Sequence, residues 1–153
     1  MIDVEVAVTI RRPRSDVAAV MFDPRYDTVW IGGVLQVRPA PPGPLRLGTK
    51  IARVSRILGR RVADIREVVE HVPERCVEMV AQFPSGLRIR YELEGIPEGT
   101  IARISARGSP TGRLRLVVPA INPLLRHAVI RDLARLKALL ETGAWRRLAV
   151  GPA

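Results

Sequence analysis

The chain has 153 residues, of which 47% are hydrophobic and only one is a cysteine, and it carries a net charge of +10. This length suffices for the core of one domain, while the composition excludes an internal disulfide, a cysteine-based metal cluster and a membrane span of roughly 20 apolar residues. The arginines that carry the charge are spread along the chain without a long basic run or a known motif, so nucleic-acid binding is not favoured.

The N-terminal part of the chain predicts a strand and two short helices. Residues 3–11 alternate between apolar and polar side chains, which is typical of a half-buried strand. Ser15 is suited to be the N-cap of a short helix that ends before Asp23 and Pro24. The residues that follow predict a second short helix or turn that ends at Trp30.

Strands dominate the middle of the chain. A brief strand precedes the loop of residues 39–48, whose prolines exclude regular structure. Five strand-like runs follow, separated by short turn sequences: residues 49–58, 60–72, 75–83, 87–96 and 100–108. Connections this short make consecutive strands antiparallel neighbours, so these runs predict a meander.

A long amphipathic helix is predicted near the C-terminus. Asn122 is suited to be its N-cap and Pro123 its first residue, and Gly143 is a natural stop. One face of this helix is apolar: Leu125, Ala128, Val129, Leu133, Leu136, Leu139 and Leu140. We assign residues 1–143 to a single domain and expect residues 144–153 to form a loose tail.

The order of these elements predicts an α+β fold. A curved antiparallel sheet of about seven strands has one apolar face to cover, and the long C-terminal helix is the only large element available to cover it. A bent sheet closed by one helix leaves room for a cavity, and an apolar cavity of this kind is the default ligand site.

Several segments, taken in their order and spacing, resemble a known superfamily. They are RPRSDVAAVMFDPRYDTVW, a GGV turn, PLRLGTK, LGRR, REVVEHVPER, YELEG followed by GT, and RDLARLKALLE, and together they cover residues 2–141. The superfamily is SRPBCC, the START-like, helix-grip proteins often described as polyketide cyclase/dehydrase or lipid-transport-like. The resemblance implies a deep hydrophobic cavity that binds lipids, sterols, polyketides or hormones, and a minority of members are cyclases or dehydratases with polar residues in the cavity wall. It supplies no family-wide catalytic signature, and Trp30 and Thr100 match positions that mark the fold.

Asp132 is the first candidate for chemistry, because it lies on the apolar face of the long helix between Leu125 and Leu139. There it either acts as an acid, a base or an anchor for a polar group of a ligand, or it has a structural role. In the structural role it pairs with an arginine of the sheet or reaches water near the open end of the helix. The ion pair is the favoured interpretation, since buried carboxylates are paired in most folds.

The strand of residues 60–72 carries charges on both faces. Val62, Asp64, Arg66 and Val68 share one face, and Ala63, Ile65, Glu67 and Val69 share the other. We favour the second face as the inward one because it is the more apolar, and this would bring Glu67 inward. The alternative is that Asp64 and Arg66 face the cavity. If the strand instead runs past the edge of the sheet, its charges lie in solvent, and this is the favoured interpretation of the charges.

Tyr91 lies on the apolar face of its strand, where its hydroxyl either donates a hydrogen bond to a ligand or its ring simply fills the core. Tyr91 and Asp132 are the candidate catalytic residues. The other expected ligand-binding residues are apolar and lie on the inner faces of the predicted elements: Trp30, Met79, Phe83, Ile104, Val129, Leu133 and Leu136.

No metal or cofactor is expected. Neither His71 nor His127 has a second ligand at metal-binding spacing. Cys76 has no evident base partner, and no glycine-rich phosphate loop occurs.

These observations predict a carrier, sensor or store that binds a small hydrophobic molecule, such as a lipid, a polyketide or another aromatic or isoprenoid compound, in an internal cavity. One alternative is a cyclase- or dehydratase-like enzyme that uses polar residues of the cavity. Another is a basic surface module that binds polyanions through Arg88, Arg90, Arg103 and Arg107. The N-terminus does not have the pattern of a signal peptide, so we expect a cytoplasmic location. We expect the protein to be a monomer or a homodimer.

Overall fold

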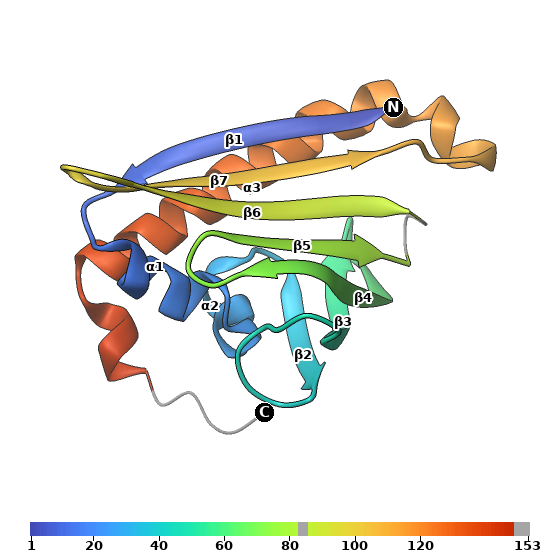
Figure 1. The fold of residues 1–153 in the computed structure, drawn as a ribbon. Helices are drawn as coiled ribbons and strands as arrows, with labels where there is room; N and C mark the ends of the chain where they lie inside the picture. The colour runs from blue at the N-terminus through green and yellow to red at the C-terminus, as the bar shows by residue number, and fades with distance from the viewer. Residues whose placement is uncertain (83–85, 149–153) are drawn as a thin grey trace.

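The computed structural model describes residues 1–82 and 86–148. Within them, seven strands form one antiparallel sheet in the order β1-β7-β6-β5-β4-β3-β2. Their bounds are β1 (Ile2–Ile10), β2 (Val34–Ala40), β3 (Lys50–Ile57), β4 (Arg60–Val72), β5 (Cys76–Ala81), β6 (Leu87–Ile96) and β7 (Gly99–Gly108). From β2 to β7 each strand lies beside the next in sequence, so the predicted meander is confirmed, and β1 completes the sheet beside β7 (Figure 1).

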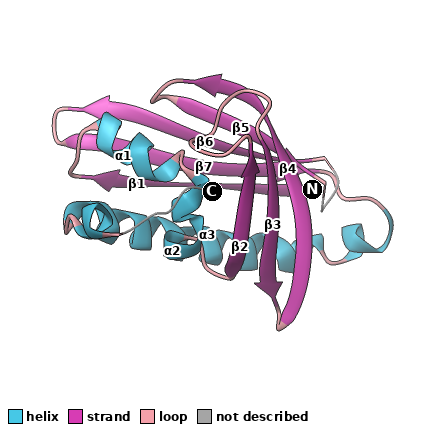
Figure 2. Ribbon diagram, turned by 90° about the horizontal axis from the view of Figure 1, so that it is seen from below, coloured by secondary structure: helices cyan, strands magenta, loops and turns pink. Residues whose placement is uncertain are grey.

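The helices lie before β2 and after β7. The first group comprises α1 (Arg14–Met21), the 3-10 helix η1 (Pro24–Tyr26) and α2 (Asp27–Trp30). The second comprises η2 (Gly112–Leu116), α3 (Val118–Glu141) and η3 (Ala144–Arg147). α3 lies across one face of the sheet and packs along β1, and α1 and α2 lie beside it (Figure 2). The predicted α+β helix-grip architecture is therefore confirmed.

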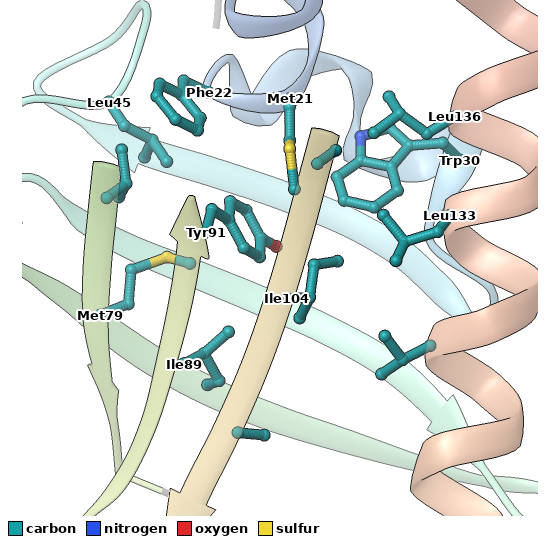
Figure 3. Close-up of a cluster of buried hydrophobic side chains, with 14 of the residues drawn as sticks. Met21, Phe22, Trp30, Leu45, Met79, Ile89, Tyr91, Ile104, Leu133 and Leu136 are labelled. Atoms are coloured by element: carbon teal, nitrogen blue, oxygen red, sulfur yellow. The ribbon is translucent and has the colours of Figure 1, made fainter. Parts of the chain in front are cut away.

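Alternating side chains of the strands build the core under α3. The inward residues of β6 are buried: Leu87, Ile89, Tyr91 and Leu93. The inward residues of α3 recur every third or fourth position: Val129, Leu133, Leu136 and Leu140. Trp30, which is 1% exposed, lies beside Leu133 and Leu136 and links α2 to this core (Figure 3).

α3 begins at Val118, before the predicted cap at Asn122, and Pro123 lies inside the helix. The Asn122 amide joins α3 to β1, because its Oδ1 accepts from the Asp3 N–H at 3.1 Å and its Nδ2 donates to the Met1 carbonyl at 3.0 Å. The predicted cap was wrong because this side chain bonds to a strand that is distant in the sequence.

Two further local predictions differ from the structure. Pro13, not Ser15, occupies the N-cap position of α1, and no side chain caps that helix. Residues 144–147 form η3 where a loose tail was expected. Trp145 packs against the core, and Arg146 Nη2 lies 3.4 Å from Asp16 Oδ2 of α1, which holds this segment against the domain.

Candidate functional site

A pocket of about 110 Å³ lies between α2, α3 and the inner face of the sheet. Most of its wall is apolar: Trp30, Ile31, Leu87, Ile89, Ile104, Ala106, Leu125 and Val129. Four polar side chains complete it: Arg53, Arg66, Tyr91 and Asp132. The pocket is thus more polar than the predicted cavity, and it is smaller than the about 150 Å³ of an apolar cavity that admits benzene.

Tyr91 projects from β6 into the space beneath α3. Its ring is stacked with that of Phe22 at a centroid distance of 6.5 Å, and the Trp30 ring lies at 6.0 Å in a tilted arrangement. The hydroxyl points toward Ile104 and α3 (Figure 3), and no described residue forms a hydrogen bond with it. Burial raises the pKa of Tyr91 to about 12, and the charge of Asp27 adds to this rise. The pocket therefore holds a neutral hydroxyl that is free to donate.

The inner face of β4 is the opposite of the one that we favoured from the sequence. Asp64 and Arg66 turn inward and Glu67 is exposed. Arg66 Nε donates to Asp64 Oδ2 at 3.0 Å, and burial lowers the pKa of Arg66. Our prediction was wrong because the pairing of β4 with β3 decides which face of β4 turns inward. Arg66 lies opposite Ile51, which is buried, so Arg66 lies on the inner face as well. The register of β4 with β5 shifts only after Val68, so the shift does not alter the face on which Arg66 lies.

Arg53 is a pocket residue that the sequence did not reveal. It lies two positions after the buried Ile51 on β3, so both side chains share the inner face. Its partner in the β3–β4 register is Asp64, yet no described residue forms a hydrogen bond or an ion pair with its guanidinium. The wall thus contains one arginine that is already paired, Arg66, and one whose charge is available to a ligand. The alternation of β3 about Ile51 was the signal for its inward position.

Asp27 is the second group that the sequence did not reveal. It is the first residue of α2, is 6% exposed, and lies one helical turn before Trp30 on the same side of that helix. No described residue donates a hydrogen bond to its carboxylate. Burial raises the pKa of Asp27 to about 7, and the charges of Arg53 and Arg66 oppose this rise. Asp27 therefore changes its charge near neutral pH, close to the Tyr91 hydroxyl.

Asp132 is held by two donors. Its Oδ1 accepts from the Gly32 N–H at 2.8 Å and from Arg135 Nη1 at 2.9 Å. Burial raises the pKa of Asp132, and these two donors oppose the rise. An arginine partner was predicted and is present, but it comes from the same helix and not from the sheet. Gly32 permits this approach, because a Cβ at that position would lie 2.9 Å from Arg135 Nη1.

The predicted site residues fall into three groups. The pocket wall includes Trp30, Tyr91, Ile104, Val129 and Asp132. Met79, Leu133 and Leu136 are buried in the core outside that wall, and Figure 3 shows Met79 on the side of Tyr91 that faces away from α3. Phe83 lies outside the described residues.

Other reactive groups lie away from the pocket. Cys76 is buried on β5, where its thiol contacts Glu70 and burial raises its pKa to about 11, which disfavours a nucleophilic thiolate. In residues 1–82 and 86–148, no group of three or more His, Cys, Asp or Glu side chains is placed to hold a metal ion. In the same part of the chain, no helix has both the length and the apolar character needed to cross a membrane.

The arginines on the outer face of the sheet are mostly neutralised by acids. The ion pairs are Arg88–Glu78, Arg90–Glu70 and Arg107–Asp3, with N–O distances of 2.9, 3.0 and 3.3 Å. These pairs weaken the positive field of that face, so the geometry does not favour a polyanion-binding surface there.

The fold and the pocket define a helix-grip protein, in which a curved sheet and a long C-terminal helix enclose a site between them. Residues 1–141 match the model of the family described as polyketide cyclase / dehydrase and lipid transport. The chain belongs to this family, which confirms the resemblance seen in the sequence. A comparison with curated proteins found no match.

Solved structures share this fold at low sequence identity. SA2116 from Staphylococcus aureus, a protein of unknown function, has a TM-score of 0.72 and 12% identity, over 94% of this chain and 96% of that one. The di-domain ARO/CYC StfQ from the steffimycin biosynthetic pathway has a TM-score of 0.72 and 14% identity, over 94% of this chain and 52% of that one. DynU16, a putative protein in the dynemicin biosynthetic locus, has a TM-score of 0.66 and 23% identity, over 92% of this chain and 48% of that one.

Proposed function

We propose that this protein binds a small molecule that combines an apolar body with an acidic group, such as a carboxylate or an enolate, in the pocket beneath α3. The observation that carries the proposal is the Arg53 guanidinium, which lines a mostly apolar pocket and forms no hydrogen bond or ion pair with any described residue. A half-buried cation without a partner is costly, and an anionic group of the ligand removes this cost by forming charge-assisted hydrogen bonds.

The other pocket residues suit the same kind of ligand. The Tyr91 hydroxyl remains protonated at neutral pH because its pKa is about 12, so it donates to the anion. Ile89, Ile104 and Val129 offer apolar surface to the rest of the molecule. The description of the family, polyketide cyclase / dehydrase and lipid transport, includes molecules of this type. We propose a carrier, sensor or store of an acidic lipid or polyketide.

Binding of such a molecule requires the pocket to widen. Its volume of about 110 Å³ corresponds to only a few water molecules at about 30 Å³ each. We therefore expect side chains of the wall to move when the ligand enters, so that the ligand stabilises a wider state of the same site.

The test compares an acid with its neutral ester. Native mass spectrometry of freshly purified protein first shows whether a ligand is retained. Calorimetry on ligand-free protein then measures the dissociation constants of decanoic acid and methyl decanoate. We expect the acid to bind at least about tenfold more tightly, because only the acid forms a charge-assisted bond with Arg53. Arg53→Gln should abolish this preference.

Arg56→Gln is the matched control, because Arg56 lies on the same strand with its side chain exposed. It should leave the preference for the acid unchanged. Equal affinity of the unmodified protein for acid and ester, or an equal loss in both variants, would rule out Arg53 as the anchor.

One observation favours a second function, proton transfer on the bound molecule. The Asp27 carboxyl has a pKa of about 7 and lies near Tyr91 and Arg53, and an acid or base is most effective when its pKa is near the working pH. In that case Asp27 takes the proton from a C–H group next to a carbonyl and returns it. The measurement is deuterium exchange into ethyl acetoacetate in heavy water, followed by NMR. Asp27→Asn should reduce the protein-dependent rate by about a hundredfold; exchange at the buffer rate with the unmodified protein excludes this function.

A further inference from the structure

We infer that the end of the molecule formed by η2 and the first half of α3 docks on the surface of an anionic lipid bilayer. Figure 1 places η2 at one end of the molecule, beyond the ends of the strands, and the first turns of α3 beside the start of β1 at the same end; Figure 2 shows the same end from below. Exposed apolar and basic side chains lie together along this segment, and we call them the basic–apolar end: Arg113, Arg115, Leu116, Val117, Leu124 and Arg131.

The apolar side chains of this end face solvent although the helix beside them is well packed. Leu116 is 75% exposed and Leu124 is 61% exposed, whereas Val118 is buried and anchors the start of α3. Leu124 and Arg131 lie two turns apart on the side of α3 that faces away from the core. Large apolar side chains gathered at an exposed end beside polar groups mark an interaction surface.

The charge of this end is not neutralised. Between residues 109 and 131 the chain contains four arginines and no acidic residue. Among the described residues, none forms an ion pair or a hydrogen bond with the side chains of Arg113, Arg115 or Arg131. The arginines of the outer sheet face, by contrast, are mostly paired with acids. The available positive charge is therefore placed beside the exposed leucines.

A bilayer with anionic headgroups satisfies both features at once. The headgroups pair with the arginines, and the boundary of the acyl chains takes up the leucines. A soluble polyanion such as a nucleic acid would use the arginines alone and leave the leucines in water. The inference does not depend on ligand binding, although Leu125 and Val129 of the pocket wall lie on the adjacent side of the same helix segment, so a docked bilayer would lie close to the pocket.

Co-sedimentation with vesicles tests this inference on the full chain. One set of vesicles contains phosphatidylcholine alone, and the other contains phosphatidylcholine and phosphatidylglycerol in equal amounts. We expect binding to the anionic vesicles to be at least about tenfold stronger and to weaken as salt is added. The double variant Arg113→Gln/Arg115→Gln should lose about tenfold or more of this affinity, and Leu116→Gln/Leu124→Gln should lose at least about tenfold.

Leu47→Gln is the matched control, because Leu47 is 70% exposed but lies in the loop between β2 and β3, away from this end (Figure 1). It should bind as the unmodified protein does, and thermal unfolding of each variant shows whether the fold is intact. Equal binding to both kinds of vesicle, or full binding by the leucine variant, overturns the inference. Binding to heparin without binding to vesicles would also overturn it. The same holds if the leucine variant changes the oligomeric state but not the binding to vesicles.

Discussion

At the scale of single residues, the electrostatics of the pocket depend on two charged groups that form no bond with each other, one in the pocket wall (Arg53) and one near it (Asp27). Asp27 comes from α2 and Arg53 from β3, and neither has a hydrogen-bond partner among the described residues. Arg66 and Asp132, by contrast, are both bonded: Arg66 pairs with Asp64 of the same strand, and Asp132 accepts from Arg135 of the same helix and from the Gly32 N–H. The unsatisfied groups are therefore the ones to examine for ligand binding and for pH dependence.

Asp27 should make the protein less stable as pH rises. Its pKa is about 7 in the folded protein and about 3.9 in an unfolded chain. Below about pH 4 both states are protonated and the residue has no effect, whereas between about pH 4 and 7 only the unfolded chain ionises, so the free energy of unfolding falls. Asp27→Asn should raise the free energy of unfolding at pH 8 by on the order of 4 kcal/mol, as measured by urea denaturation.

The same variant should show no difference from the unmodified protein near pH 4, apart from effects of the amide itself. Glu98→Gln serves as a control, since Glu98 is exposed in the turn between β6 and β7. A stability difference for Asp27→Asn that is the same at every pH would contradict the raised pKa.

At the scale of elements, α3 protects one of the two edges of the sheet, the one formed by β1. β1 is an edge strand, and an edge strand leaves one row of backbone groups unpaired. Side chains of α3 satisfy three of these groups: Asp3 N–H donates to Asn122 Oδ1, Arg126 Nη1 donates to the Glu5 carbonyl, and Lys137 Nζ donates to the Thr9 carbonyl. Just after β1, the Arg11 N–H donates to Glu141 Oε2. The long helix therefore does more than cover the core, because its side chains form hydrogen bonds with backbone groups of β1 that a further strand would otherwise pair.

Lys137 offers a direct test of this role. Its Nζ lies 2.6 Å from the Thr9 carbonyl and 2.7 Å from Glu141 Oε2. Lys137→Met keeps the length of the side chain but removes both bonds, so we expect the free energy of unfolding to fall by about 1–2 kcal/mol. Hydrogen exchange of the amides in β1 should become faster.

Arg131→Met is the control for that change, since Arg131 is exposed on α3 and its side chain forms no bond with any described residue. Its stability should stay within about 0.5 kcal/mol of the unmodified protein. Unchanged exchange in β1 after Lys137→Met would argue against protection of the edge by α3.

At the scale of the whole molecule, the pocket is small because α3 packs closely on the sheet. Helical residues of the first half, such as Leu125 and Val129, line the pocket, whereas Leu136 and Leu140 in the second half are fully buried in the core. The site is therefore a gap in a continuous core, and its size depends on every element that contributes a side chain.

Enlarging this gap should lower the stability of the fold and at the same time raise the affinity for the ligand. Ile104→Ala and Leu140→Ala each remove a buried side chain and should each cost about 2–5 kcal/mol of unfolding free energy. Only Ile104 lines the pocket, so only Ile104→Ala should tighten the binding of decanoic acid, by about fourfold for each additional CH2 that becomes buried. Calorimetry and urea denaturation give the two quantities. Similar affinity changes in the two variants would mean that the ligand binds elsewhere.

The order and type of the elements were predictable from the sequence because they rest on local periodicity. The alternation in β6 and the apolar stripe of α3 are patterns within one segment, and they identified Tyr91 and Asp132 as inward residues. The start of α3 was not predictable in this way, since Asn122 resembles a cap until its bonds to β1 are seen.

By itself, the sequence determined an α+β meander closed by a long helix, because alternation and helical spacing are properties of neighbouring residues. Only the tertiary structure decided which face of β4 turns inward, since the register with β3 overrides the hydrophobicity of the strand. It also decided that Asp27, Arg53 and Tyr91 lie near one another, because they come from three elements that lie far apart in the sequence. The tertiary structure also decided the volume of the pocket, because this volume depends on how the side chains of all these elements pack together.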